Sequence, residues 1–253
     1  MGRALERRRL RQAHLFCSDL DGTLVGDDAA TERFRAAWQA TKAPPLLVYS
    51  SGRLIDDMRA LLDKVPLPTP DFLIGGVGTM MFDVAAAAHV DAFAHTLSEG
   101  WDLSQVERVL TGVPGAVRQP TEFLHDRKSS WYLHDAEPAA IAAIGAELAA
   151  SGLRAQIVYS SARDLDVIPA TAAKGAALDW LCRHVGVELT AAIVAGDTGN
   201  DATMFKLPGI RGILVGNALP ELVEASAGAE TFHAREAAAD GVLEGLRHFG
   251  VIA

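Results

Sequence analysis

Apolar residues along the chain gather in short runs, each followed by a polar turn. Short apolar runs bounded by turn residues are typical of strands in a parallel sheet, where both faces of a strand are buried. We therefore predict strands at residues 15–17, 46–49, 73–74, 193–195 and 213–215.

Between these runs, apolar residues recur at helical spacing over residues 54–65 and 177–185, and Gly186 stands where the second helix should end. Strands that alternate with amphipathic helices predict an α/β fold with a doubly wound parallel sheet, in which helices cover both faces. Ligands bind at the carboxyl ends of the strands in such folds. The turns after the predicted strands are therefore the candidate binding positions.

Residues 84–169 follow a different pattern, in which helices and strands no longer alternate regularly. We predict that this α+β block is a small domain inserted into a core made of residues 13–83 and 170–253. Its predicted elements are a helix near 103–110, a strand at 129–135, a helix opened by Pro138 and closed by Gly152, and strands at 155–161 and 164–169.

Composition narrows the classes of partner. The chain has 253 residues, 49% of them hydrophobic, and its net charge is −9. We expect no binding to nucleic acid or to anionic membranes, because those partners require clustered positive charge. The two cysteines, Cys17 and Cys182, lie in apolar segments. We therefore expect neither a disulfide framework nor a thiolate metal site, which fits a cytoplasmic protein.

Two segments need a separate interpretation. The apolar run at residues 72–82 is closed by Asp71 and Asp83 and, at 11 residues, is too short to span a bilayer. It suits a buried strand and a turn. Residues 1–12 contain five arginines but no apolar stretch after them, so they do not resemble a secretory signal. We expect a disordered or frayed tail there.

The strongest chemical signal is the segment FCSDLDGT, in which Asp19 and Asp21 follow a predicted strand. Residues two apart point the same way from a strand, so both carboxylates can face the crevice above the sheet, while Gly22 lets the chain turn away. Paired carboxylates repel each other and therefore require a cation or a division into acid and base. The alternative is an acidic turn that merely caps the strand.

A second acidic segment, GDTGND, follows the predicted strand at 193–195 and contains Asp197 and Asp201. Carboxylate oxygens without cysteine or clustered histidine select a hard cation, and Mg²⁺ with waters and a phosphate oxygen suits so open a site. A surface turn is the alternative. Two acidic clusters at strand ends of one α/β domain favour the metal site.

Two further segments suit a phosphate. Ser51 and Gly52 follow the strand at 46–49 and precede a helix, so a hydroxyl and backbone N–H groups can face an anion. Lys174 opens the helix that continues through 177–185, where its charge opposes the helix dipole unless an anion lies nearby. Taken singly, Ser51 can be an ordinary helix cap and Lys174 a solvated lysine.

Together, DLDGTLVGD, YSSGR, AAKGAA and GDTGND resemble, in order and spacing, the four motifs of the haloacid-dehalogenase superfamily of Mg²⁺-dependent phosphatases. The resemblance covers nearly the whole chain. SSGRLIDD, GGVGTM, KSSWYLHD, IVYSSARDLDVIP and VGNALPEL are similar to the sucrose-phosphatase branch, and most of all to its mannosylfructose-phosphate phosphatases. In this superfamily, the insert between the second and third motifs is a cap over the active site.

The resemblance implies roles for the acidic residues. Asp19 is expected to be the nucleophile that forms an aspartyl-phosphate, and Asp21 the acid that protonates the leaving group and the base that activates water. Mg²⁺ is expected to be held by Asp19, the backbone carbonyl of Asp21 and Asp197, with Asp201 supporting this shell.

It also implies where the substrate binds. Ser51, Gly52 and Lys174 are expected to hold the phosphoryl oxygens, with Asn200 orienting its neighbours. The sugar is expected to bind in the cap, where polar and aromatic groups suit hydroxyls and ring faces. Trp131 in the same segment can be core, and an exposed cap strand would also be polar. The cap candidates are Lys128, Ser130, Tyr132, His134 and Arg163.

Two alternatives come from other classes. A phospho-acceptor receiver domain also uses an aspartate, Mg²⁺ and a lysine, but it needs neither the insert nor Asp21. A sugar-phosphate-binding protein without activity is compatible with the fold. Among enzymes, the predicted substrate is a small sugar phosphate: mannosylfructose-phosphate, sucrose 6-phosphate or trehalose 6-phosphate. Composition does not separate these three, and it indicates no oligomeric state.

Overall fold

The computed structural model describes residues 13–97 and 99–252, so the tail predicted at residues 1–12 lies outside the described residues. Within this part, eight strands form one sheet in the order β12-β11-β10-β1-β2-β3-β4-β5, parallel from β12 to β3 and antiparallel beyond. The strands are β1 (Leu15–Ser18), β2 (Leu46–Ser50), β3 (Phe72–Gly75), β4 (Met80–Asp83), β5 (Ala88–His89), β10 (Ala192–Gly196), β11 (Arg211–Leu214) and β12 (Glu230–His233). The predicted doubly wound α/β core is confirmed.

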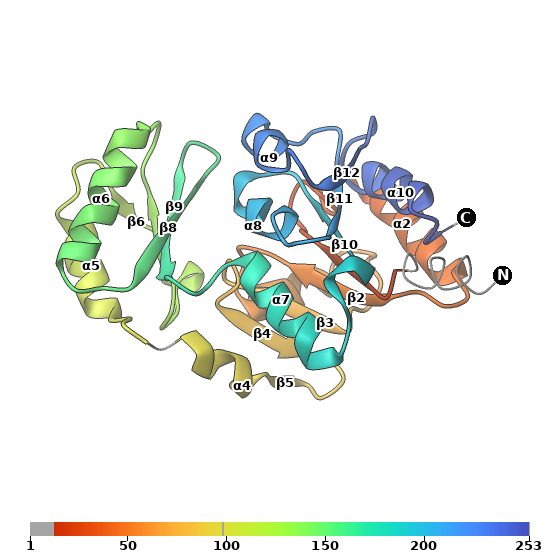
Figure 1. Ribbon diagram of the computed structural model, residues 1–253, viewed down its shortest axis with the longest axis horizontal. Helices are drawn as coiled ribbons and strands as arrows, with labels where there is room; N and C mark the ends of the chain where they lie inside the picture. The colour runs from red at the N-terminus through yellow and green to blue at the C-terminus, as the bar shows by residue number, and fades with distance from the viewer. Residues whose placement is uncertain (1–12, 98, 253) are drawn as a thin grey trace.

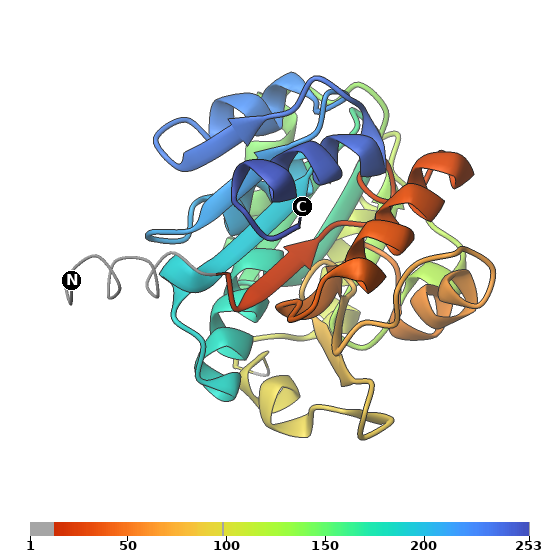
Figure 2. The same cartoon turned by 90° about the vertical axis from the view of Figure 1, so that its right-hand side faces the viewer.

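Helices cover both faces of this sheet (Figure 1). Figure 2 shows two of them, α2 (Asp28–Ala40) and α10 (Ala238–His248), side by side in front of the sheet. α3 (Ile55–Leu62) packs into the same buried cluster as these two. The opposite face carries α4 (Asp91–Ala94), α7 (Lys174–Val185), α8 (Ala202–Phe205) and α9 (Pro220–Ala225), with η3 (Leu189–Ala191) and η4 (Gly199–Asp201) in the connections.

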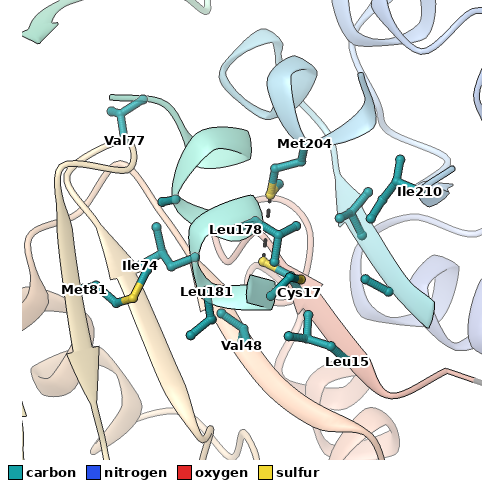
Figure 3. Close-up of a cluster of buried hydrophobic side chains, with 14 of the residues drawn as sticks. Leu15, Cys17, Val48, Ile74, Val77, Met81, Leu178, Leu181, Met204 and Ile210 are labelled. Carbon is teal, nitrogen blue, oxygen red and sulfur yellow. Dashed lines mark hydrogen bonds between the residues drawn. The ribbon is translucent and has the colours of Figure 1, made fainter. Parts of the chain in front are cut away.

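Strand β1 places its side chains alternately in the two halves of the core. Leu15 and Cys17 lie in the cluster drawn in Figure 3, whereas Phe16 lies in the cluster on the other face. This is the period-two alternation of a strand covered on both sides. Cys17 Sγ lies 3.9 Å from Met204 Sδ, and both cysteines are buried and free, as predicted. The end of β1 is thus fixed by close packing on both faces.

A second, four-stranded antiparallel sheet lies in the middle of the chain, in the order β6-β7-β9-β8. Two helices pack against one face of it, and Figure 1 shows them on the side away from the large sheet. The elements are α5 (Leu103–Thr111), β6 (Val117–Arg118), η2 (Thr121–Phe123), β7 (Ser129–Tyr132), α6 (Pro138–Ala150), β8 (Ala155–Ser160) and β9 (Asp164–Pro169). We call this sheet the cap sheet and its unit the cap.

The large sheet continues past the domain boundary predicted at residue 84. Strand β5 pairs with β4, and Phe93 and Leu97, from α4 and η1 (His95–Leu97), are buried in the cluster under the sheet. We therefore propose that the cap begins after Leu97. Among the described residues, we find no helix that combines the length and the hydrophobicity needed to cross a membrane.

Candidate active site

Asp19 and Asp21 lie in the loop that follows β1. The loop is closed by backbone hydrogen bonds from Leu24 and Val25 to the carbonyl of Leu20, both 2.8 Å. Gly22 has φ of +80°, and a Cβ there would lie 2.2 Å from Asp197 Oδ2. Only glycine meets both conditions. The turn therefore brings the first acidic segment directly against the second.

Three carboxylates meet at the ends of β1 and β10. Asp201 Oδ2 accepts the backbone N–H groups of Asp197 and Thr198 at 3.1 and 3.2 Å, which folds the second acidic segment back on itself. Thr23 Oγ1 donates to Asp197 Oδ1 at 3.1 Å. Asp19, Asp197 and Asp201 each offer an oxygen within 4.8 Å of the others, and all three are buried. The structure thus brings the two acidic segments together.

Lys174 is the first residue of α7, and its side chain is fully buried. Its ammonium donates to Asp19 Oδ1 and Asp201 Oδ1, both at 2.6 Å, and to Asn200 Oδ1 at 2.7 Å. Burial alone would lower the pKa of Lys174, but the two carboxylates outweigh it and hold the pKa above its usual value. Lys174 is therefore not a solvated lysine.

The charge in this cluster is unbalanced. Three carboxylates face one ammonium, which leaves two negative charges uncompensated when all are ionised. Burial, opposed by Lys174, raises the pKa of Asp19 well above its usual range. Burial and then the charge of Asp201 raise the pKa of Asp197 to about 6. Oxygen donors with an excess of two charges are compatible with Mg²⁺.

Asp21 is not part of this group of three carboxylates and is held by Arg53. The guanidinium makes a bidentate contact with Asp21, 2.7 and 2.8 Å, and a third bond to Asp57 at 2.8 Å. About half of the Asp21 side chain is exposed. Arg53 was part of the predicted SSGR turn, but the sequence assigned it no role, because its partner lies 32 residues away. It fixes the direction of Asp21.

Ser51 and Gly52 follow β2 at the edge of the same site. Ser51 is 1% exposed, and its Oγ accepts the backbone N–H of Arg53 at 3.1 Å. α3 begins only at Ile55, with Leu54 as its N-cap. The interpretation of Ser51 as a helix cap is therefore wrong.

A cavity of about 540 Å³ lies between these residues and the cap sheet. Its floor includes the core residues Asp19, Asp21, Ser51, Gly52, Asp197 and Asn200. Its roof includes three of the predicted cap residues, Lys128, Tyr132 and Arg163, with Asp164 and Asp166 beside them. Most of the predicted core residues and three of the five predicted cap residues thus face one open cavity, whereas Lys174 and Asp201 are not among the residues that line it.

Side chains along and just before β7 alternate between the face over the cavity and the face packed against the cap helices. Lys128 is 3% exposed, and its ammonium contacts Asp166 Oδ1 at 2.8 Å and the hydroxyl of Ser130. Trp131, the next residue along, points to the opposite face and is buried between the sheet and the cap helices, so it is core. One face of the cap sheet is polar and covers the cavity, and the other carries the cap's apolar core.

The other cap candidates differ: Ser130 is fully buried, contacts Lys128 and is not among the residues that line the cavity. The guanidinium of Arg163 lies 5.4 Å from the ring centre of Tyr132, over the cavity. His134 follows β7, is exposed, and stacks on Tyr132 with ring centres 6.5 Å apart. It lies outside the residues that line the cavity.

Asp166 was missed by the sequence analysis. Asp164 and Asp166 stand at alternate positions of an otherwise apolar strand, which is a signal for one polar face.

Fold and site together define a phosphatase of the haloacid-dehalogenase superfamily, with two acidic segments and a buried lysine below an inserted cap. A likeness to a sugar phosphatase of this superfamily, at TM-score 0.67 and 18% identity over 95% of this chain and all of the other, supports the fold. The family model for sucrose-6F-phosphate phosphohydrolase matches residues 12–250, and the chain belongs to that family. It is a sugar-phosphate phosphatase, and the receiver-domain alternative is wrong.

Individual relatives agree with this family. The mannosylfructose-phosphate phosphatase of Agrobacterium fabrum is 49% identical, and the match covers 96% of this chain and 99% of that protein. The probable sucrose-phosphatase 2 of Arabidopsis thaliana is 30% identical over 93% of this chain, which spans 59% of the plant protein's length. The sucrose-phosphatase of Synechocystis sp. PCC6803, solved with sucrose and phosphate, has TM-score 0.87 and 29% identity over 94% of this chain and 98% of that one.

Proposed function

We propose that the protein is a Mg²⁺-dependent phosphatase that hydrolyses mannosylfructose-phosphate through an aspartyl-phosphate at Asp19. The proposed substrate rests on the 49% identity to the Agrobacterium fabrum enzyme, which extends over nearly the whole of both chains. Sucrose 6-phosphate is the second candidate, favoured by the family model and by the Synechocystis structure. Both are disaccharide phosphates, and the polar roof of the cavity suits either.

In the first step, a carboxylate oxygen of Asp19 attacks phosphorus, and the bond from phosphorus to the sugar oxygen breaks. The carboxyl group of Asp21 gives its proton to that oxygen, so the sugar leaves as an alcohol. In the second step, Asp21 takes a proton from water, which attacks the aspartyl-phosphate and releases inorganic phosphate and Asp19. Two easier displacements replace one difficult one. The contact with Arg53 holds Asp21 at the cavity wall for both transfers.

Mg²⁺ would be held by Asp19, Asp197, the backbone carbonyl of Asp21 and, directly or through water, Asp201. When bound, it neutralises negative charge that otherwise keeps the carboxylate and the phosphate apart. The three buried carboxylates with one ammonium fit a divalent cation in charge and in donor type.

The transferring phosphoryl group would be bound by the hydroxyl of Ser51, the backbone N–H of Gly52 and the ammonium of Lys174. Asn200 orients that ammonium through its bond of 2.7 Å. Lys174 and Ser51 are both buried and hydrogen bonded, so their positions are fixed before substrate binds. The three N–H groups of Lys174 are all engaged, so a phosphoryl oxygen would replace one of their acceptors. Donors held in place stabilise developing negative charge with little reorganisation.

The sugar would be recognised by the roof. The buried pair Lys128–Asp166 presents a donor and an acceptor in fixed positions, and Ser130, Tyr132 and Arg163 add a hydroxyl, a ring face and a cation. A site built to bind hydroxyls rejects analogues that lack them, because its buried polar groups are left unpaired. We place the enzyme in the cytoplasm, where the free cysteines stay reduced.

A phosphate-release panel tests the proposal. Mannosylfructose-phosphate, sucrose 6-phosphate and trehalose 6-phosphate are compared with and without Mg²⁺, and we expect the highest kcat/KM for the first. EDTA should abolish release and Mg²⁺ restore it. Asp19→Asn should keep the fold and lose turnover, because an amide is a poor nucleophile. Activity of this variant within tenfold of the parent, or release after complete chelation, contradicts the mechanism.

A further inference from the structure

His125 lies at the junction of cap and core, in a turn that the catalytic scheme does not use. Its backbone N–H donates to the carbonyl of Lys128 at 3.3 Å, and the N–H of Lys128 donates back at 3.0 Å. His125 and Lys128 therefore close the same four-residue turn. Lys128 faces the cavity from one end, and the imidazole of His125 reaches the core from the other.

The imidazole is held by a chain of hydrogen bonds whose directions are fixed. Thr79, in the turn between β3 and β4, donates its hydroxyl proton to the carbonyl of Gly76 at 2.8 Å. Its oxygen can then only accept from Nε2–H of His125, 2.5 Å away. Nδ1 of His125 accepts the backbone N–H of Arg127 at 3.2 Å. Both contacts require the neutral ring with its proton on Nε2.

The core turn is shaped to admit this ring. Gly76 has φ of +58°, and a Cβ there would lie 2.4 Å from the hydroxyl of Thr79 and 2.9 Å from Nε2 of His125. Any larger residue would displace the imidazole. Thr79 itself is 2% exposed. The GGVGT segment of the core thus forms the binding position for the side chain of His125 from the cap.

The rest of the turn is anchored as well. Trp101, where the chain enters the cap, donates its indole N–H to the carbonyl of Asp126 at 2.7 Å. Lys128 is tied to Asp166 on the neighbouring strand β9. With His125 fastened to Thr79, the turn has one anchor at its entry, one in the cap sheet and one in the core. Of these three anchors, the one through His125 crosses from cap to core.

The charges around the ring support its neutral form. Burial and then Lys128 lower the pKa of His125 to about 4; Arg127 and His89 act in the same direction, and Asp126 opposes them. The ring is therefore uncharged over the range in which an ordinary histidine titrates.

We propose that His125 is a positioning residue for sugar recognition: by hydrogen bonding to Thr79, it fixes the 125–128 turn so that Lys128 is held at the cavity that Asp19 also lines before substrate binds. This inference rests on the proposed function, because Lys128 is assigned there to the sugar. It adds a residue that touches no substrate. Lifting the cap off the core must break the His125–Thr79 bond, so the bond favours the closed arrangement.

Two substitutions of His125 separate its two contacts. Asn keeps an acceptor at the position of Nδ1, and so the local bond to Arg127, but is too short to reach Thr79. Gln reaches as far as Nε2 and keeps a donor for Thr79. Thr79→Val removes the partner at nearly constant shape. His233→Asn, an exposed histidine on the edge strand β12, is the matched control.

The readout is kcat/KM for the disaccharide phosphate divided by that for p-nitrophenyl phosphate, which has no sugar. We expect His125→Asn and Thr79→Val each to lower this ratio about tenfold, mainly through KM, as the loss of one hydrogen bond allows. The double variant should be no worse than either single one, because both remove the same bond. His125→Gln should recover part of the loss, and His233→Asn should match the parent.

Several results would overturn the inference. Equal losses on both substrates would make His125 a folding residue, and additive losses would mean that His125 and Thr79 act separately. ¹⁵N NMR of the imidazole, assigned by comparison with His125→Asn, should show Nε2–H from pH 8 to about 5; a titration near 6.5 would refute the hydrogen-bond chain. A parent that releases no phosphate from any disaccharide phosphate overturns the proposed function as well, whereas an active parent with an unchanged ratio in His125→Asn overturns only this inference.

Discussion

Replacing Lys174 by Met keeps most of the side chain but removes the ammonium, and with it the bonds to Asp19, Asp201 and Asn200. The carboxylates stay buried without a counter-charge. Removal of one partner from a buried ion pair costs about 3–5 kcal/mol. Since about 1 kcal/mol shifts the melting temperature of a chain of this size by about 2–4 °C, we expect a loss of about 6–20 °C.

The loss should depend on pH. In the parent, the raised pKa of Lys174 keeps its contribution to stability constant below the pKa of an unfolded lysine, and so across the whole working range. In the parent, the pKa values of Asp19 and Asp197 are already raised, although Lys174 lowers them. Without that cation both pKa values should rise further, so the variant should gain more stability than the parent as the pH falls, and the difference in stability between the two should narrow.

Thermal unfolding followed by circular dichroism, in EDTA at pH 8 and pH 5, measures both effects. Lys206→Met, an exposed lysine at the end of α8, is the control and should melt like the parent. Phosphate release by Lys174→Met should fall together with its affinity for substrate. A melting temperature within about 2 °C of the parent at pH 8, with unchanged kcat, would refute the argument, since about 3 kcal/mol corresponds to at least 6 °C.

Three further predictions use other parts of the site. Asp21→Asn should lose the base of the second step, so a phosphoenzyme should persist and be visible by intact-mass spectrometry after a rapid quench; turnover at the parental rate would reject this role. Mg²⁺ should raise the melting temperature more at pH 8 than at pH 5. Asp197 has a pKa of about 6, so its ionisation lowers the stability of the fold as the pH rises, and the bound cation removes this loss. Equal shifts at the two pH values would contradict this. Gly22→Ala should push Asp197 aside and lower Mg²⁺ affinity, as measured by titration calorimetry. Gly152→Ala, at nearly the same φ of +79° but with nothing within 4 Å, should lose stability alone, and a normal affinity in Gly22→Ala would show that the loop adapts.

The core of the site was predictable because its parts are local. Asp19, Ser51 and Asp197 each follow an apolar strand, and the carboxyl ends of neighbouring parallel strands converge at one edge of a sheet. Strand pairing therefore assembles residues that lie far apart in sequence. The helical spacing of the residues after Lys174 also placed it correctly at a helix start. The sequence alone did not show that Lys174 is buried in the site rather than solvated.

The residues that sequence reasoning missed depend on how the cap docks. His125 and Thr79 are 46 residues apart and lie in turns outside the strands, one in the cap and one in the core, so no periodicity relates them. We propose a domain boundary after Leu97 rather than at residue 84, and the sequence gives little sign of it because β5 has two residues, too few for a hydrophobic pattern. His134 was included because alternation along β7 was continued past Tyr132, where the strand ends.

The division of labour within the cap sheet matters for changing the enzyme by directed evolution. Tyr132 and Asp164 line the cavity, while Trp131 and Leu165, their neighbours along the same strands, hold the sheet to the cap helices. A library that randomises the first set leaves the second untouched, so most of its members should still fold. Variants with new sugar preferences can then be selected while the residues that act on the phosphate stay unchanged. The number of variants screened, rather than loss of stability, then limits what is found.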